Sequence, residues 1–364
     1  MLYRSVIMNV ESTRSVLDLA HKMQKLQAFV HVSTAYSHCY NSKIEEKFYP
    51  DAKESLDELI QKCKDPSVPL VSVLGNHPNT YTFTKALAER LIEEEGKDLP
   101  IAIVRPSIVV ASWKDPFPGW VDNFNGPTGI IVGAGAGIMR SMMVCRKKTA
   151  DLIPVDIPIN VMLVAAWKVA QGAGAKIPIY NVTSGQVNPI TWGNMEKIML
   201  KSIYKYPMET VLWYPGGSFK TSAFYDCLCR WCFHYFPALL VDVCMTLFLK
   251  PRFMLNIADK MAKNQKVLQY FSTREWIWSN HNVHKLRQEL ADTDPQSLSK
   301  FDFDISSIDW KEFLDHYVLG ARHYVLKNSP DTLEKSRRKL KLLHLLHLLV
   351  QFVFIILISY FLMS

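Results

Sequence analysis

A phenol and an ammonium group stand four residues apart in this chain, at Tyr81 and Lys85. Residues four apart lie on one face of a helix, so the two side chains point the same way if this segment is helical. The pKa of an unperturbed tyrosine is about 10, and a positive charge beside the phenol lowers it. The pair is therefore a candidate for proton transfer near neutral pH, although this spacing alone is more often solvated helix surface.

The segment that must position the pair has the features of a helix. Asn79 or Thr80 can cap its N-terminus, every fourth residue from Phe83 to Leu91 is apolar, and Gly96 can end it. The apolar stripe buries one face and leaves Tyr81 and Lys85 on another.

Strand-like runs at residues 28–32 and 101–104 lie on either side of this helix. Strand, helix and strand form a βαβ unit, and in open α/β sheets ligands bind beyond the carboxyl ends of the strands. The residues at those two ends are Ser33, Thr34, Arg105, Pro106 and Ser107. We expect a ligand beside Ser33, Thr34 and Ser107.

The end of the chain is more apolar than the rest. The chain of 364 residues is long enough for two domains with sizeable cores. Its composition is 49% hydrophobic and 21% charged. Residues 342–363 are almost entirely apolar and would form a helix about 33 Å long, enough to span a bilayer. The basic residues that flank it on one side are Lys335, Arg337, Arg338, Lys339 and Lys341. This pattern predicts a tail anchor with the preceding chain in the cytosol, and a buried C-terminal helix is the alternative.

The cysteines favour a reducing compartment. No signal-peptide pattern precedes residue 30, so the seven cysteines are expected to be thiols. The Cys227-x-Cys229-x-x-Cys232 cluster near His234 lies in an aromatic-rich run that is untypical of a zinc knuckle. We therefore expect buried free thiols there and no metal site.

The net charge of +8 comes partly from the basic cluster before the tail. Because basic and aromatic residues do not alternate as they do in nucleic-acid binding surfaces, attraction to an anionic membrane or an acidic cofactor is the better explanation. The run from Phe236 to Leu249, apolar apart from Asp242 and Thr246, is too short to span a membrane by itself. We expect it to be core, with an interfacial face that admits an acyl chain as the alternative.

At Ser33–Thr34, Tyr81-x-x-x-Lys85 and Arg105–Ser107 the chain resembles the extended short-chain dehydrogenases. It is more specifically similar to the alcohol-forming fatty acyl-CoA reductases, and this resemblance runs from about residue 7 to about residue 327. The segments that carry it are residues 29–36, 79–89, 104–107, 119–126, 213–217 and 271–276.

The resemblance implies a reaction and a role for each site residue. Family members use NADPH to reduce a long-chain acyl-CoA to an aldehyde and then to an alcohol. Tyr81 would protonate the oxyanion, and Lys85 would lower the pKa of Tyr81 and hold the nicotinamide ribose. Thr34, or Ser33 as the second choice, would hydrogen-bond the carbonyl oxygen, and Asn9 matches the helix asparagine that supports the lysine. The residues implied to line the nicotinamide side are Arg105, Pro106 and Ser107.

The chain departs from the family pattern at its beginning. The Gly-x-x-Gly-x-x-Gly turn, the first strands and the segment that binds the adenosine ribose are missing, and no glycine occurs between Met1 and Gly75. Ser12 stands where the family usually has glycine. The glycines at 133, 135 and 137 do not replace that turn, because Ile138 stands where the motif needs glycine, and we expect a close-packed turn there.

The predicted fold is α/β: a partial Rossmann-like, doubly wound parallel sheet lacking its first strands, a mainly helical C-terminal domain and a C-terminal transmembrane helix. The expected domains are residues 1–190 for catalysis and NADPH binding, 191–330 for the family's C-terminal domain, and 342–363 for the anchor.

The predicted function is NADPH-dependent reduction of long-chain or very-long-chain acyl-CoA to fatty alcohol. The alternative is an inactive family member that binds acyl-CoA, the membrane or a partner reductase, and a different extended dehydrogenase, such as a sterol enzyme, is less favoured. The expected location is the peroxisomal membrane, with the endoplasmic reticulum as the alternative, and homo-oligomer formation stays open.

Overall fold

The computed structural model describes residues 2–49, 54–172 and 176–363. The chain forms two compact units whose segments alternate along the sequence. Unit 1 comprises Met1–Val109, Asp151–Pro189 and Trp276–Ile308, and unit 2 comprises Val110–Ala150, Ile190–Glu275 and Asp309–Ser364. This arrangement differs from the contiguous domains expected from the sequence, because composition does not reveal that residues 110–150 pack with the later part of the chain.

A parallel three-stranded sheet forms the centre of unit 1. Its strands are β1 (Phe29–Val32), β3 (Ile101–Pro106) and β7 (Ile179–Val182), in the order β1-β3-β7. Phe29 lies opposite Ile101, and Val104 lies opposite Tyr180. Every residue of the middle strand β3 is buried, as is typical of a parallel strand covered on both faces.

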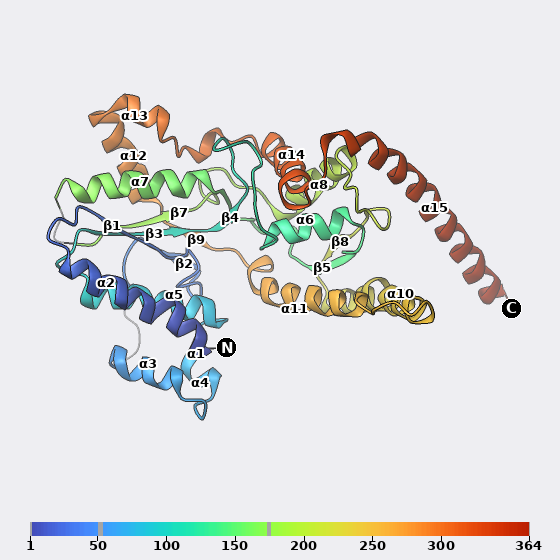
Figure 1. The fold of residues 1–364 in the computed structure, drawn as a ribbon, viewed down its shortest axis with the longest axis horizontal. Helices are drawn as coiled ribbons and strands as arrows, with labels where there is room; N and C mark the ends of the chain where they lie inside the picture. The colour runs from blue at the N-terminus through green and yellow to red at the C-terminus, as the bar shows by residue number, and fades with distance from the viewer. Residues whose placement is uncertain (1, 50–53, 173–175, 364) are drawn as a thin grey trace. The chain divides into compact units, whose positions relative to one another are not determined.

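Helices cover both faces of this sheet, with α7 on one side and α2 and α5 on the other (Figure 1). The bounds of these helices are Ser12–Lys22 for α2, Thr80–Glu95 for α5 and Asp156–Ala170 for α7. The predicted α/β class, with a doubly wound parallel sheet, is confirmed. The remaining elements of unit 1 are α1 (Leu2–Val6), the π-helix η1 (Ile7–Glu11), β2 (Lys43–Ile44), α3 (Leu56–Lys64), α4 (Leu70–Leu74), β4 (Ile108–Val110), β6 (Leu152–Pro154), β9 (Ile277–Trp278), α12 (His281–Thr293), α13 (Pro295–Lys300) and η3 (Ile305–Ser307).

The predicted helix that carries Tyr81 and Lys85 is α5. Its N-cap is Asn79, whose Oδ1 accepts a hydrogen bond from the Thr82 backbone N–H at 2.9 Å. Phe83, Leu87 and Leu91 all lie in the core of unit 1. The helix ends before Gly96, as predicted.

Unit 2 is mainly helical around a short parallel pair of strands, β5 (Ser141–Met143) and β8 (Ser218–Lys220). This confirms the helical C-terminal region. Its other elements are α6 (Pro127–Gly135), α8 (Trp192–Lys205), α9 (Ala223–Arg230), η2 (Trp231–Tyr235), α10 (Phe236–Leu247), α11 (Met254–Ser272), α14 (Trp310–Gly320), η4 (Ala321–Val325), η5 (Pro330–Thr332) and α15 (Leu333–Met363). The expected turn after α6 is present at Gly137, which has φ +77°.

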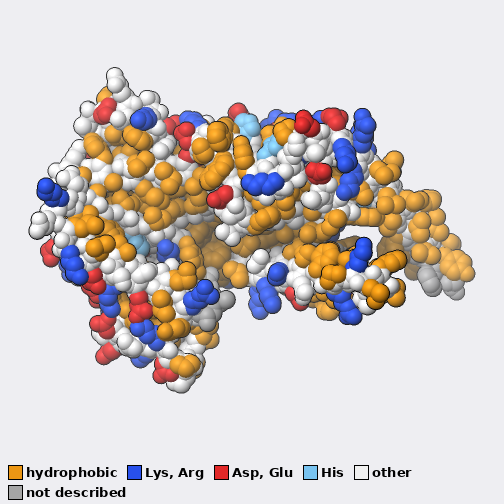
Figure 2. All heavy atoms as spheres, viewed as in Figure 1, with side chains coloured by type: hydrophobic (Ala, Val, Ile, Leu, Met, Phe, Trp, Pro, Cys, Tyr) orange, Lys and Arg blue, Asp and Glu red, His pale blue; other side chains and the backbone are white. Residues whose placement is uncertain are grey.

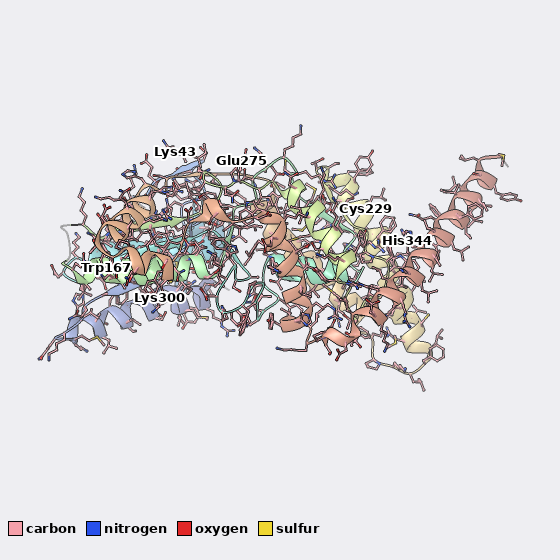
Figure 3. The ribbon with its side chains drawn as sticks, turned by 90° about the horizontal axis from the view of Figure 1, so that it is seen from above. Lys43, Trp167, Cys229, Glu275, Lys300 and His344 are labelled. Carbon is pink, nitrogen blue, oxygen red and sulfur yellow. The ribbon has the colours of Figure 1, made fainter. Side chains whose placement is uncertain are left out.

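Two helical stretches of the described chain are long and apolar enough to cross a membrane, Ala223–Leu247 and Pro330–Tyr360. The second overlaps the predicted anchor at residues 342–360, where its apolar side chains are exposed. Near the start of the predicted anchor, His347 accepts a hydrogen bond from Trp213 Nε1 at 3.2 Å, and the ring of His344 (Figure 3) lies 4.5 Å from that of Tyr214. The first half of α15, up to His347, therefore contacts the rest of unit 2, and the second half extends away from it (Figure 1).

Two expectations for unit 2 are wrong. The run that begins at Phe236 is not core, because Phe236 is 57% exposed and Leu247 is 77% exposed. The cysteines of the 227–232 cluster are free, but Cys227 and Cys232 are exposed and Cys229 (Figure 3) is only partly buried. Both errors have one cause: apolar composition indicates burial in a core only if other elements pack against the segment.

Candidate active site

The carboxyl end of β1 brings Thr34 to Tyr81. Strand pairing continues past β1, because the Ser33 N–H donates to the Val104 carbonyl at 2.8 Å and the Ala35 N–H to that of Pro106 at 2.9 Å. This register holds Thr34 beside the first turn of α5, where its hydroxyl is near enough to the Tyr81 phenol to act on the pKa of that group. The Thr34 Oγ1 also accepts the Tyr36 N–H at 3.3 Å.

Tyr81 remains accessible, with 49% of its surface exposed. Partial burial raises the pKa of the phenol above 10, and the neighbouring Thr34 hydroxyl opposes that shift. This direction differs from the lowered pKa expected from the Tyr-x-x-x-Lys spacing. The phenol is therefore protonated at neutral pH in the ligand-free chain.

Lys85 lies one turn further along α5 but points its ammonium toward β1. Its Nζ donates to the Val32 carbonyl at 3.0 Å. Burial lowers the pKa of Lys85, while the carboxylate of Glu89 raises it. Because an ammonium has three N–H groups, Lys85 can bind a further oxygen without losing its contact with β1.

Asn9 supports α5 one residue before Lys85. It lies in the π-helix η1, and its Nδ2 donates to the Thr84 Oγ1 at 2.9 Å. The Thr84 hydroxyl in turn donates to the Thr80 carbonyl at 2.8 Å. The structure thus places Asn9 against the first turns of α5, and its contact is with Thr84 instead of with Lys85.

The serines at the two strand ends are both buried. Ser33 is 4% exposed, and its hydroxyl has no hydrogen-bond partner in the described chain. The Ser107 hydroxyl is likewise without a partner there, and the neighbouring Asp151 carboxylate accepts the Ser184 N–H at 2.8 Å. Pro106 contributes the carbonyl that accepts the Ala35 N–H. Ser33 therefore has free hydrogen-bonding capacity beside Thr34.

The side chain of Arg105 is completely buried and engaged within unit 1. Its Nη2 and Nε lie 2.6 and 2.9 Å from the carboxylate of Glu89, and it donates to the Glu45 and Lys47 carbonyls. His38 approaches the same carboxylate at 3.1 Å. Arg105 can therefore contribute to a nicotinamide site through the backbone that presents Pro106 and Ser107, and not through its guanidinium group.

Glu89 is the residue of this region that the sequence analysis missed. Burial acts to raise its pKa, but attraction to Arg105 and hydrogen bonds from His38 and Arg105 hold the pKa far below its ordinary value. The carboxylate therefore stays charged between Lys85 and Arg105. Its position four residues after Lys85 on a helix was a signal that could have revealed it.

The described residues fit the nicotinamide riboside end of a dinucleotide. The unpartnered Ser33 hydroxyl, the accessible phenol of Tyr81 and the spare N–H groups of Lys85 lie at the carboxyl ends of parallel strands, where such ligands bind. No glycine-rich turn for the pyrophosphate occurs among the described residues before β1. The fit therefore concerns one end of the cofactor.

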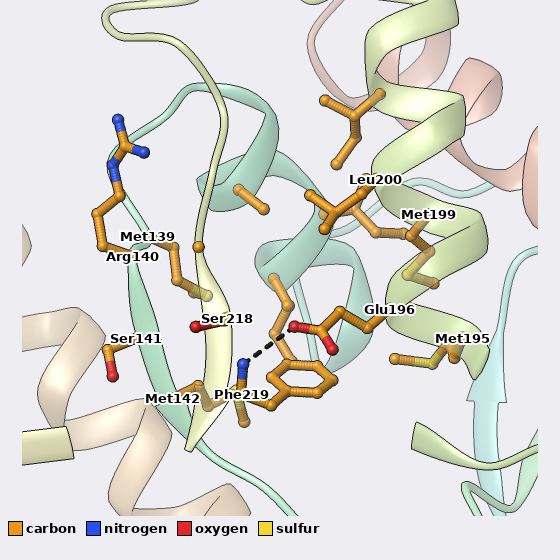
Figure 4. Close-up of a pocket in the computed structure, with 15 residues that line it drawn as sticks. Met139, Arg140, Ser141, Met142, Met195, Glu196, Met199, Leu200, Ser218 and Phe219 are labelled. Carbon is orange, nitrogen blue, oxygen red and sulfur yellow. Dashed lines mark hydrogen bonds between the residues drawn. The ribbon is translucent and has the colours of Figure 1, made fainter. Parts of the chain in front are cut away.

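Unit 2 holds a separate, mainly apolar pocket with a cavity volume of about 50 Å³. Met195, Met199 and Leu200 project into it from α8, opposite Phe219 of β8 (Figure 4). The Glu196 carboxylate accepts the Phe219 N–H at 3.0 Å and so joins α8 to β8. The methionine side chains that line the pocket are flexible.

A parallel sheet covered on both faces, with a Tyr–Lys pair at the carboxyl end of a strand, defines a Rossmann-like oxidoreductase. Two family models, both described as male sterility protein, match residues 2–162 with an NAD-binding domain and residues 233–328 with a Sterile domain. The chain belongs to the fatty acyl-CoA reductase family.

Curated relatives carry that name. The chain is 38% identical to fatty acyl-CoA reductase 1 of Xenopus laevis, over 92% of this chain and 65% of the relative. It is 38% identical to fatty acyl-CoA reductase 2 of Mus musculus and 37% identical to that of Homo sapiens, in each case over 96% of this chain and 68% of the relative. The chain thus spans about two thirds of the length of these relatives.

Solved structures are similar at lower identity. The terminal R domain of the myxalamid PKS-NRPS pathway matches with a TM-score of 0.49 and 15% identity, over 86% of this chain and 62% of that one. The UDP-glucuronic acid 4-epimerase of Bacillus cereus, in complex with NAD, matches with a TM-score of 0.46 and 13% identity, over 88% of this chain and 68% of that one.

Proposed function

We propose that this chain takes part in the NADPH-dependent reduction of long-chain or very-long-chain fatty acyl-CoA to fatty alcohol. The observation that carries the proposal is the accessible Tyr81 phenol beside the Thr34 hydroxyl and one helical turn before Lys85, in a chain of the fatty acyl-CoA reductase family. The curated relatives are longer than this chain, so acyl-CoA reduction by the whole protein is part of the proposal.

In this proposal Thr34 and Tyr81 bind the carbonyl oxygen of the thioester and later that of the aldehyde. Two hydroxyl donors already in place stabilise the negative charge that develops on this oxygen. NADPH, when bound, supplies the hydride for each of the two reductions. In the first reduction the C–S bond of the thioester breaks and coenzyme A leaves as its thiol. In the second, Tyr81 donates its proton to the oxygen, so that the product is an alcohol.

The raised pKa of Tyr81 suits the direction of reduction. A phenol that is protonated at neutral pH can donate a proton at once, whereas a phenolate would first have to gain one. Lys85 holds the nicotinamide ribose with N–H groups that are not bonded to Val32, and its charge stabilises the phenolate after the proton has left. Asn9 positions this part of α5 through Thr84.

The cofactor contacts proposed for this chain lie at the nicotinamide riboside end. Ser33, next to Thr34, has a hydroxyl without a hydrogen-bond partner in the described chain. Residues 105–107 lie at the same edge of the sheet and would contact the cofactor through their backbone and through Ser107. We also propose that the cofactor is NADPH in preference to NADH. The described residues that we assign to the cofactor contact only its nicotinamide riboside end.

The membrane location is proposed from α15, whose apolar side chains are exposed. The basic residues before it support a cytosolic location for the catalytic part. We place the anchor in the peroxisomal membrane, with the endoplasmic reticulum as the alternative.

The test is turnover by the purified, detergent-solubilised chain with NADPH and palmitoyl-CoA, with hexadecanol measured by mass spectrometry. Tyr81→Phe removes the proposed acid and should abolish alcohol formation. Tyr3→Phe is the matched control, because Tyr3 is also exposed and lies in α1 of the same unit.

Each outcome decides between the proposal and its alternative. Alcohol formation that needs Tyr81 and not Tyr3 supports the proposed function. A folded chain that binds palmitoyl-CoA but neither binds nor oxidises NADPH would instead support a non-catalytic role in binding acyl-CoA or a partner reductase.

A further inference from the structure

Helices α9, η2 and α10 run without a break from Ala223 to Leu247 and fold back on α11 as a hairpin. The turn is built by Asp242, whose carboxylate accepts the N–H groups of Phe253, Met254 and Leu255 at 3.0 Å each. A carboxylate at this position satisfies the free N–H groups at the start of α11. We call residues 223–272 the helical hairpin.

Three polar side chains of the helical hairpin, Asp226, His234 and Gln265, are buried against unit 2. Asp226 and His234 are 2% and 7% exposed, and both bond β5 or the residue before it. The Ser141 hydroxyl donates to Asp226 at 2.8 Å, and the Arg140 N–H donates to His234 Nε2 at 2.8 Å. From α11, the Gln265 amide donates to the Ser141 carbonyl at 3.0 Å. Hydrogen bonds therefore hold both arms of the hairpin to one strand.

The large apolar side chains of the helical hairpin face outward. Hydrophobic side chains are visible over α10 and α11, with lysines and arginines among them (Figure 2). The exposed residues include Phe224, Leu228, Trp231, Phe236, Leu239, Leu240, Val243, Leu247, Phe248 and Leu249. This is the reverse of the distribution on a surface helix in water, where the apolar stripe faces the core. A surface of this kind is expected to be covered by something apolar.

Basic residues border this apolar face. Lys250 and Arg252 lie in the turn, and Lys260, Lys263 and Lys266 lie on α11, all exposed. Lysine and arginine side chains on an apolar face can extend to the phosphate groups of lipids while their stems stay among the acyl chains. Charge complementarity therefore favours an anionic bilayer as the partner.

The geometry also limits how the hairpin can lie. Asp226 and Gln265 both bond Ser141, so the two arms begin and end at one strand and do not cross to the far side of a bilayer. A hairpin pushed in end-on would carry Lys250 and Arg252 at its tip into the hydrocarbon, which is costly. Lying flat, it places the apolar face at the boundary of headgroups and acyl chains and leaves the cations in the headgroup layer.

We propose that the outer face of the helical hairpin, from Phe224 to Leu249, is a second membrane-binding surface that lies in the interface of an anionic phospholipid bilayer. It is distinct from α15, which is expected to span the bilayer. The inference does not depend on the proposed reaction, because it rests on the distribution of side chains in unit 2 alone.

The test uses the full chain, reconstituted into vesicles of phosphatidylcholine and phosphatidylserine and anchored by α15. A photoreactive residue is introduced in three separate variants, as Leu239→p-benzoylphenylalanine, Leu247→p-benzoylphenylalanine and, for control, Val71→p-benzoylphenylalanine. Val71 is 82% exposed and belongs to α4 of unit 1, so it matches the hairpin positions in type and accessibility. A fourth variant, Leu349→p-benzoylphenylalanine in α15, verifies that lipid adducts are detected.

The expected result is a lipid adduct at positions 239, 247 and 349 and no lipid adduct at position 71. A lipid adduct at 349 but at neither hairpin position would overturn the proposal. Adducts between two copies of the chain at 239 and 247, in place of lipid adducts, would overturn it as well, because they would identify a second copy as the cover of this face.

Discussion

Glu89 connects the candidate site to the stability of unit 1. Its carboxylate is 1% exposed and lies between Arg105 on β3 and the ring of His38, one helical turn after Lys85. Burial lowers the pKa of Lys85, and the same charge that neutralises the buried Arg105 opposes that shift. One side chain therefore serves the core and the site.

Replacing Glu89 with glutamine should destabilise the chain by about 3–5 kcal/mol, because the charge of Arg105 is then left buried without compensation. Urea unfolding followed by tryptophan fluorescence in mild detergent measures this loss. Glu94→Gln, which breaks the more exposed pair with Arg90, is the control and should cost at most about 0.5 kcal/mol. Equal losses in the two variants would contradict the role given to Glu89.

The same residue predicts a pH dependence. The pKa of Glu89 is lowered in the folded chain from its ordinary value of 4.5, so its contribution is present at pH above 4.5 and is lost as the pH falls further. The difference in stability between the natural chain and Glu89→Gln should therefore shrink below pH 4.5 and stay constant above it.

The first turn of α5 depends on its cap. Asn79 supplies the only side-chain hydrogen bond that the structure gives to the Thr82 N–H, and Tyr81 lies inside the turn that this bond closes. A frayed first turn would displace the phenol from Thr34. The first turn of α5 thus controls the position of the Tyr81 phenol relative to Thr34, on which the proposed proton transfer depends.

Asn79→Ala should lower the free energy of unfolding by about 1 kcal/mol, whereas Asn79→Ser should be nearly neutral because serine also caps helices. Thermal unfolding of both variants in the same detergent provides the comparison. If the alanine and serine variants melt at the same temperature, the cap does not contribute to stability.

At the scale of the whole molecule, two different surfaces can meet lipid. The helix α15 is a span by length and composition, and the helical hairpin is an interfacial surface held to β5 by hydrogen bonds. The two should respond differently to treatments that distinguish integral from peripheral attachment.

The double variant Leu349→Arg with Ile355→Arg places two charges near the centre of the span, at a cost of about 5–7 kcal/mol for insertion. We expect alkaline carbonate to release this variant from isolated peroxisomal and endoplasmic reticulum membranes, while the natural chain stays in the pellet. Val71→Arg, on an exposed helix of unit 1, should remain in the pellet like the natural chain. Retention of the double variant after carbonate treatment would argue against α15 as the span.

The sequence by itself determined the local structure of the site. The cap at Asn79, the apolar stripe of α5 and the strand ends at Thr34 and Ser107 follow from interactions between residues close in the chain. Such interactions are visible as spacing, because helix and strand impose fixed periods on neighbouring side chains.

Only the tertiary structure decided what the side chains contact and which apolar surfaces are buried. Arg105 proved to be engaged by Glu89, and Lys85 by the Val32 carbonyl, because the sheet and α5 bring these groups together. The outer face of α10 looked like core because composition records that a residue is apolar and not whether protein packs against it. Contacts between residues distant in the sequence, such as Ser141 and Asp226, decide which face of a helix is buried. No local sequence pattern reveals such contacts.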